Sequence, residues 1–231
     1  MRKAFAKGLI DGMPIGLGYL SVSFGFGIFA VSLKIPAFYA WLISATNLTS
    51  AGQAAGVEII AACGTILEMA LTQLIINLRY SLMGFSLTQK LDGSFTTPKR
   101  LLLAFGITDE IYAVAISRQG KISASYMLGL IVLPFIGWTT GTAIGALAGE
   151  LLPSFISNAM GILLYGMFIA IFVPPAKKSK PVLLTVLLAA AFSLIFKYLL
   201  PSVSFGFAII ISALVSSAIC AAIFPIKEAA E

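Results

Sequence analysis

Two adjacent carboxylates, Asp109 and Glu110, lie inside the apolar stretch Leu101–Ser117. One carboxylate near the middle of a membrane helix costs roughly 2.5–3.5 kcal/mol on insertion scales. A pair therefore needs a cation partner, a water-filled cavity, a protonated state or a segment that does not cross the bilayer. Ionisable residues inside membrane segments often mark transport paths, so we predict that this pair faces such a path. The alternative is that both acids are solvated at the membrane interface.

The counter-ion of Arg79 is the next question. Arg79 lies about three turns from Glu68 on one predicted helix, which is too far for a direct pair. An unpaired arginine is costly in hydrocarbon. We therefore expect the acidic pair at 109–110 to be its partner, and we assign Arg79, the two acids and Glu68 to ion pairing or coupling. The alternative for Arg79 is snorkelling to the interface.

These charges lie on a patterned helix, predicted over Thr65–Leu87. At 100° per residue, one stripe and its neighbour are polar, so this side is expected to face protein or water and not lipid. The two stripes consist of Glu68, Thr72 and Arg79, and of Gln73, Asn77 and Tyr80.

A polar, glycine-containing insert, Thr49–Gly56, interrupts the apolar segment Ala37–Ala62. Such a stretch is a poor continuous membrane helix and is tolerated only where it is buried in protein or lines a cavity. We predict a helix break whose backbone N–H groups and side chains bind substrate. The candidate substrate-binding residues are Thr49, Ser50, Gly52, Gln53, Asn77, Asp109 and Glu110.

Glycines are concentrated in the segments Met13–Leu33 and Ala124–Gly149. Glycine at three- and four-residue spacing lets helices approach closely. The alternative for the first segment is a broken helix whose free backbone groups bind substrate.

Composition indicates the fold class. The chain has 231 residues, of which 59% are hydrophobic and 10% charged, with a mean hydropathy of +1.02. We predict an all-α polytopic membrane protein that forms one transporter domain, with room for seven or eight helices of about 20 residues, some broken or re-entrant. The formal charge of +6 lies in short basic loops, including Pro174–Pro181, and indicates topology instead of nucleic-acid binding.

The side-chain inventory excludes several kinds of chemistry. Histidine is absent, so any proton coupling must use carboxylates. Cys63 and Cys220 are isolated in apolar segments, which favours small packing residues over a disulfide or a metal site. No nucleotide-binding loop GxxxxGK[ST] occurs. We therefore expect no cofactor, no metal and no enzymatic activity.

The basic loops constrain the topology. If every segment crosses, the loop at Lys99–Arg100 lies outside with a positive charge, against the positive-inside rule. If Ala37–Ala62 and Leu101–Ser117 both enter and return, the clustered basic loops all lie inside. We predict two re-entrant or broken elements.

A weak internal repeat accompanies this pattern. Pro14–Gly18 resembles Pro134–Trp138, and Asn77–Tyr80 aligns with Ile195–Tyr198 at a similar offset. Duplicated halves, over residues 11–118 and 122–231, are a common transporter device. Chance resemblance between apolar segments is the alternative.

Four short motifs carry a resemblance over essentially the whole chain. They are DGMPIGLGYLSVSFGFGI (Asp11–Ile28), TSAGQAA (Thr49–Ala55), NLRY (Asn77–Tyr80) and TDE (Thr108–Glu110). In order and spacing they resemble the large subunit of the AzlC-type branched-chain amino-acid permeases. The resemblance implies export of branched-chain amino acids and their analogues across a bacterial cytoplasmic membrane, together with a small AzlD-type membrane subunit.

A site for such a substrate needs N–H donors for its carboxylate, an acid for its ammonium and an apolar pocket for its side chain. The break at Thr49–Gly56 and the acids at 109–110 supply the polar parts. We predict a secondary exporter of valine, leucine or isoleucine, with proton exchange as the suggested energy source. The alternative is a passive pore or a binding subunit that does not itself transport.

Overall fold

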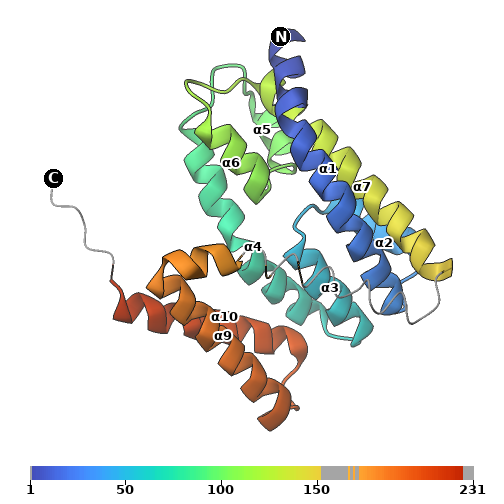
Figure 1. Ribbon diagram of the computed structural model, residues 1–231, viewed down its shortest axis with the longest axis vertical. Coiled ribbons are helices and arrows are strands. Elements are labelled where there is room, and N and C mark those ends of the chain that lie inside the picture. The colour runs from blue at the N-terminus through green and yellow to red at the C-terminus, as the bar shows by residue number, and fades with distance from the viewer. Residues whose placement is uncertain (1, 152–165, 167–168, 170–171, 226–231) are drawn as a thin grey trace. The chain divides into compact units, whose positions relative to one another are not determined.

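The computed structural model describes residues 2–151, 166, 169 and 172–225. Within these residues the fold is helical, and β-structure is limited to an isolated bridge. The helices are α1 (Arg2–Ser32), α2 (Ala37–Thr46), α3 (Ala51–Ala61), α4 (Ile66–Thr88), α5 (Thr97–Ala104), α6 (Asp109–Ser117), α7 (Ala124–Leu151), α9 (Lys180–Leu199) and α10 (Phe205–Ile223). Contacts divide the chain into a first unit, Met1–Val57 with Asn77–Leu164, and a second unit, Glu58–Ile76 with Tyr165–Glu231. Figure 1 shows these elements.

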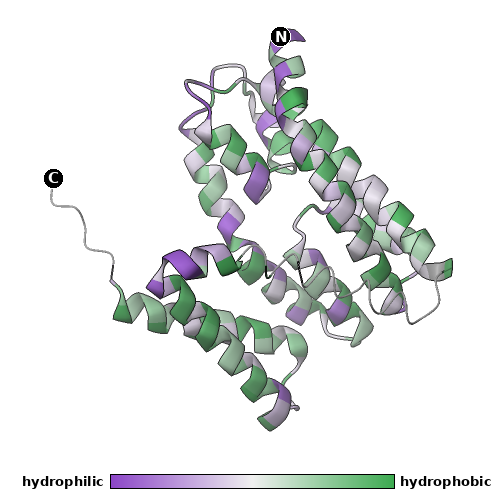
Figure 2. Ribbon diagram, viewed as in Figure 1, coloured by the Kyte–Doolittle hydropathy of each residue, from purple (hydrophilic) through white to green (hydrophobic). Residues whose placement is uncertain are grey.

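The predicted helical membrane protein is confirmed. Among the described residues, four helices are long and apolar enough to cross a membrane: α1, Ala124–Gly149 of α7, α9 and α10. They do not support the expected count of seven or eight segments. Two of the expected segments are each divided into two short helices. The expected segment Thr65–Leu87 forms α4, which is long enough but is not among the four apolar helices, and the expected segment Asn158–Val173 falls mostly outside the described residues. Hydrophilic residues gather in the loops that flank α5 and α6 (Figure 2).

Both predicted interruptions are breaks between helices. The first separates α2 from α3, where Asn47 is extended and Ser50 has a left-handed φ of 53°. The Asn47 side chain accepts a hydrogen bond from the Thr49 amide at 3.0 Å, a local bond that competes with helix continuation. The second break, between α5 and α6, ends at Thr108, which is extended and caps α6. The polar residues in each stretch thus end one helix and begin the next.

Helices α1 and α7 run side by side in the same direction and form the centre of the first unit (Figure 1). A Cβ added to Gly137 would meet the Gly16 carbonyl, and one added to Gly145 would meet the Phe24 carbonyl. From Gly16 to Phe24 and from Gly137 to Gly145 the residue numbers rise together along the two helices, so the helices are parallel. Contact between a glycine and a facing backbone confirms the close-approach interpretation. Helix α1 is continuous through Pro14, so the broken-helix alternative for this segment is wrong.

The substitution Gly145→Ala is expected to destabilise the first unit. The new Cβ would lie 2.1 Å from the Phe24 carbonyl oxygen, so the two backbones must separate. Overpacking typically costs about 1–3 kcal/mol, which exceeds the roughly 1 kcal/mol that alanine gains over glycine in a helix. Gly18→Ala is the matched control, because an added Cβ there meets nothing within 4 Å. Thermal unfolding in detergent should show a lower Tm for the first variant only, and an equal response of both would contradict the packing.

The segments before α5 and after α6 meet at one end of the first unit. Leu91 and Ile122 form the isolated parallel bridge. The Asp92 amide donates to the Ile122 carbonyl at 2.9 Å, and the Ile122 amide donates to the Lys90 carbonyl at 2.8 Å. The Lys90 ammonium also donates to the Arg118 carbonyl at 2.6 Å. The α5–α6 element therefore leaves this end of the unit and returns to it.

A charged cluster ties α1 to the start of α7 at the same end. The Asp11 carboxylate accepts from the Lys7 ammonium at 2.6 Å and from the Tyr126 hydroxyl at 2.9 Å. Arg118 lies 3.9 Å from the same carboxylate, and its guanidinium covers the Tyr126 ring at 4.1 Å. Asp11 thus has three partners from α1, α7 and the end of α6.

Two expectations about local structure are wrong. Residues 172–178 are helical, so most of the expected basic loop Pro174–Pro181 is not a loop. Pro181 falls in the first turn of α9, where its missing N–H removes no helical hydrogen bond. Cys63 is not a packing residue: it is exposed, and with φ 54° it ends α3 in the left-handed region. Cys220 is buried, as expected.

Candidate functional site

Asp109 pairs with Arg79 at the start of α6. The Arg79 Nη1 to Asp109 Oδ2 distance is 2.5 Å, and the two side chains are 41% and 45% exposed. Asp109 is the first residue of α6, where the helix dipole stabilises a negative charge. The counter-ion expected for Arg79 is therefore present. Because the pair is only half-buried, a ligand can reach both charges.

Arg79 keeps unused hydrogen-bonding capacity. Its Nη2 lies 3.5 Å from the Tyr80 hydroxyl, and its guanidinium lies 5.1 Å from the centre of the Tyr80 ring. In the described part of the chain, its Nε is buried without a hydrogen-bond partner. A guanidinium has five N–H donors in a fork that matches a carboxylate. Arg79 can therefore donate hydrogen bonds to a second carboxylate beside that of Asp109.

Glu110 has a different partner, Tyr19 of α1. The Tyr19 hydroxyl donates to the Glu110 carboxylate and lies 2.6 Å from the Thr108 hydroxyl. Thr108 in turn accepts from the Ile111 amide at 3.4 Å, as the cap of α6. Successive helical residues point about 100° apart, which explains why the two adjacent acids contact different helices.

The break between α2 and α3 is held by Gln53, which is 1% exposed. Its side-chain oxygen accepts from the Trp138 indole at 3.0 Å and from the Ser50 amide at 3.3 Å. Its side-chain nitrogen donates to the Ser44 hydroxyl at 3.0 Å, and Ser44 shares a 2.7 Å hydrogen bond with Thr142 of α7. Gln53 thus connects α2, α3 and α7.

Tyr19 and Trp138 link the two breaks. Their rings meet edge to face, with centroids 5.2 Å apart and an interplanar angle of 72°. Leu48, in the first break, packs with them. Through its hydroxyl Tyr19 contacts the start of α6, and through its indole Trp138 contacts Gln53. Buried Tyr and Trp usually place their polar ends against a partner, and that tendency was the available signal for these two residues, which sequence reasoning missed.

The remaining predicted substrate-binding residues lie in the first unit. Thr49, Ser50 and Gly52 lie at the first break, and within the described residues the Thr49 hydroxyl is buried without a partner. Asn77 is half-buried on α4, two residues before Arg79. The proposed part of these residues in substrate binding remains a prediction.

Glu68 is placed apart from this group, in the second unit. Its side chain is 4% exposed and accepts from the Gly206 amide at 2.7 Å, in the first turn of α10. An anion is stabilised at a helix N-terminus by the free amides there. Thr72, on the same stripe of α4, is fully buried, so this part of the stripe faces protein, as predicted. In this structure the Glu68 carboxylate binds an amide in the first turn of α10, and its coupling role remains a prediction.

Comparison with known proteins identifies relatives along most of the chain. The family model described as AzlC protein matches residues 14–152. The inner membrane protein YgaZ of Escherichia coli is 28% identical over 81% of this chain and 79% of its own length. The branched-chain amino acid transport protein AzlC of Bacillus subtilis is 24% identical over 77% of this chain and 70% of its own length. An uncharacterized membrane protein of Archaeoglobus fulgidus is 29% identical over 75% and 76%. No solved structure matches the chain.

Proposed function

We propose a transport function for this chain, which belongs to the AzlC protein family. It is a secondary transporter of the bacterial cytoplasmic membrane that exports branched-chain amino acids. A small AzlD-type membrane subunit is its proposed partner. The family assignment and the name of the Bacillus subtilis relative, a branched-chain amino acid transport protein, support the substrate class. The export direction and the partner follow the family resemblance noted from the sequence motifs.

The observation that carries the proposal is the half-exposed Arg79–Asp109 pair at the start of α6. An aliphatic amino acid presents one carboxylate and one ammonium, so it can bind by inserting between the two partners. Its carboxylate would use the free donors of Arg79, and its ammonium would contact Asp109. The pair then separates when substrate binds and closes again when it leaves. Such an exchange keeps every charge compensated, which a charge inside a membrane requires.

The second acid and the first break complete the proposed site. Glu110, whose carboxylate accepts from the Tyr19 hydroxyl, is the second candidate to bind the substrate ammonium or to carry a coupling proton. Thr49, Ser50 and Gly52 lie around the N-terminus of α3, whose positive dipole end favours a carboxylate. Broken helices of this kind form substrate sites in several transporter folds.

The proposed topology makes α5 and α6 a re-entrant element that opens to the cytoplasm. The bridge between Leu91 and Ile122 supports it, because the chain enters and leaves at one end. The parallel course of α1 and α7 also supports it, because both then cross from inside to outside. The parallel course of α1 and α7 also supports duplicated halves over residues 11–118 and 122–231. Cysteines placed at Lys34 and Leu151, at the ends of α1 and α7, should react from the same side of the membrane. Reaction from opposite sides would contradict both the re-entrant element and the duplication.

Cysteine labelling tests the re-entrant element. In a chain whose Cys63 and Cys220 are replaced by serine, Lys99→Cys and Lys121→Cys are expected to react with an impermeant reagent from the same side. Both positions are exposed, Lys99 in the first turn of α5 and Lys121 in the loop after α6. Lys34→Cys, exposed just after α1, is the control and should react from the other side. Reaction of the residue 99 and 121 variants from opposite sides would eliminate the re-entrant assignment.

Flux through vesicles tests the transport function. Vesicles that contain the chain and its small subunit are loaded with labelled valine or leucine, and efflux is measured with and without a pH gradient. Faster efflux than from empty vesicles, with accumulation against the amino-acid gradient when a pH gradient is imposed, is the expected result. Flux that only dissipates a gradient would favour the passive pore, and binding without flux would favour a non-transporting subunit.

A further inference from the structure

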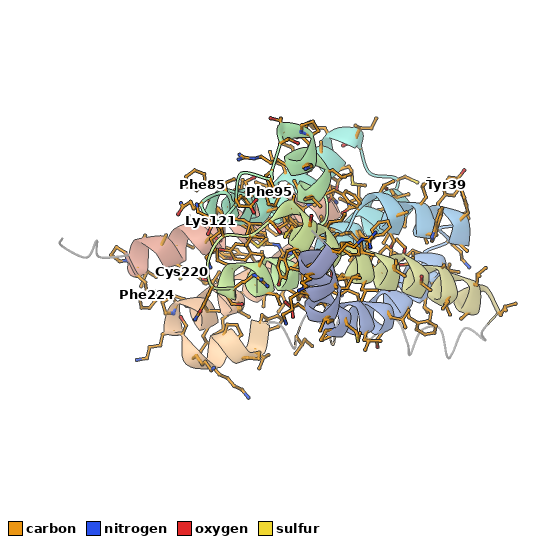
Figure 3. The ribbon with its side chains drawn as sticks, turned by 90° about the horizontal axis from the view of Figure 1, so that it is seen from above. Tyr39, Phe85, Phe95, Lys121, Cys220 and Phe224 are labelled. Carbon is orange, nitrogen blue, oxygen red and sulfur yellow. The ribbon has the colours of Figure 1, made fainter. Side chains whose placement is uncertain are left out.

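An apolar pocket in the first unit lies apart from the residues proposed to bind substrate. It has a volume of about 180 Å³ and is formed by the C-terminal end of α4, by α5 and by the start of α7. Its base consists of buried side chains, including Leu87, Phe95 and Met127. Phe95 is labelled in Figure 3. Among its lining residues Arg100 alone is charged.

The volume and lining limit what can fill this pocket. An apolar cavity of about 150 Å³ stays dry and accepts benzene in a well-studied example. A half-open pocket of about 180 Å³ with an almost entirely apolar lining offers water few hydrogen-bond partners and is suited to a hydrocarbon group. Gly84 borders it, and a Cβ added there would meet nothing within 4 Å. The missing side chain at Gly84 leaves room that no protein atom uses.

Charge at the rim indicates the other end of the ligand. In the described part of the chain the Arg100 side chain has no ion pair or hydrogen bond. Its neighbour Lys99 instead donates to the Ser94 carbonyl at 3.2 Å. The acid in this loop, Asp92, accepts from the amide and hydroxyl of Ser94. Arg100 is thus a cation that lacks an anion.

The surface around the rim is apolar and exposed. Leu101 and Leu102 of α5 are 73% and 69% exposed, and Phe85 of α4 is 73% exposed. In a membrane protein such side chains face lipid. An exposed arginine beside such apolar side chains is the arrangement that long basic residues adopt at a membrane interface.

We propose that this pocket binds one acyl chain of an anionic phospholipid and that Arg100 binds its phosphate. Basic pockets between membrane helices on the cytoplasmic side bind anionic headgroups in the same way. The position near the basic loops, with Lys90 and Lys121, favours an anionic lipid over a zwitterionic one. The proposal concerns a site distinct from the Arg79–Asp109 pair and stands whether or not the chain transports amino acids.

The test uses the purified, delipidated chain in detergent, with phosphatidylglycerol or phosphatidylcholine added. We expect phosphatidylglycerol to raise the Tm and to be retained in native mass spectra more than phosphatidylcholine. Gly84→Leu should fill the pocket and abolish both effects. Gly18→Leu is the matched control, since Gly18 also has open space around it but lies on α1 away from the pocket.

Arg100→Gln separates headgroup binding from chain binding. It should lower the preference for phosphatidylglycerol about fivefold, which corresponds to the roughly 1 kcal/mol that one basic residue contributes near an anionic surface. Lys99→Gln, which removes an adjacent charge that does not line the pocket, should lower the preference less than Arg100→Gln does, and equal effects of the two would contradict a phosphate site at Arg100.

Three results would overturn the proposal. These are equal lipid retention by Gly84→Leu and Gly18→Leu, equal affinity of the wild-type chain for the two lipids, and a Gly84-dependent rise in Tm with free leucine in place of lipid. The last result would assign the pocket to an amino acid. Absence of flux in the wild-type vesicles would count against the transport proposal only.

Discussion

Asp109→Asn is expected to reduce valine efflux by about tenfold to a hundredfold in vesicles that contain the partner subunit. The substitution keeps the size of the side chain and removes the charge that faces Arg79 at 2.5 Å. Hydrogen bonds to charged groups contribute about 1.5–3 kcal/mol, and each 1.36 kcal/mol is a factor of ten. The ammonium of the substrate would lose its partner, and Arg79 would keep an uncompensated charge.

A matched control separates this effect from a general loss of charge. Asp92→Asn removes an acid from the loop that precedes α5, where its carboxylate accepts from the amide and hydroxyl of Ser94. It should leave efflux close to that of the wild-type chain. The effect of Glu110→Gln on efflux should be independent of that of Asp109→Asn, because Glu110 bonds to Tyr19 and Asp109 to Arg79.

The double variant Asp109→Asn with Arg79→Gln distinguishes a structural pair from a functional one. Removing both charges eliminates the uncompensated arginine, so thermal stability should recover relative to Asp109→Asn alone. Efflux should not recover, because the groups proposed to hold the substrate are both gone. Recovery of efflux together with stability would show that the pair only supports the fold.

Part of this site could be predicted from the sequence because charge inside a membrane is costly. Arg79 needed a counter-ion, and the acids at 109–110 were the available partner, as the ion pair confirms. The two helix breaks followed from polar residues that offer the backbone local hydrogen bonds, such as Asn47. Both predictions depended on local chemistry that a single segment reveals.

The rest required knowledge of which segments meet. Periodicity placed Glu68 and Arg79 on one stripe of α4, but it could not show that the Glu68 carboxylate lies at the first turn of α10, within the second unit. Tyr19 and Trp138 were missed because aromatic residues are common in apolar segments, and only their contact across α1 and α7 distinguishes them. The expected count of seven or eight helical segments is not supported by the described residues, in part because a broken segment has the composition of a spanning one.

Gln53→Leu is expected to cause the largest loss of stability among single substitutions in the first unit. Sequence reasoning assigned Gln53 to the substrate, but in this structure its amide is bonded to Trp138, Ser50 and Ser44. Leucine would leave the Trp138 indole and the Ser50 amide without an acceptor. Each buried donor without a partner costs about 1–3 kcal/mol, so the free energy of unfolding should fall by about 2–6 kcal/mol.

Thermal unfolding without substrate measures this effect, with Gln89→Leu as the control. Gln89 is exposed after the end of α4, and its substitution should leave the Tm nearly unchanged. The double variant Gln53→Leu with Trp138→Phe removes one of the orphaned donors and should recover part of the loss, because replacing both partners of a buried hydrogen bond costs less than replacing one. An unchanged Tm for Gln53→Leu, together with weaker valine binding, would show that Gln53 binds substrate and contradict its structural role. A lower Tm with partial recovery in the double variant would make Gln53 the residue that fixes the first break against α7 and so holds the N-terminus of α3 in position.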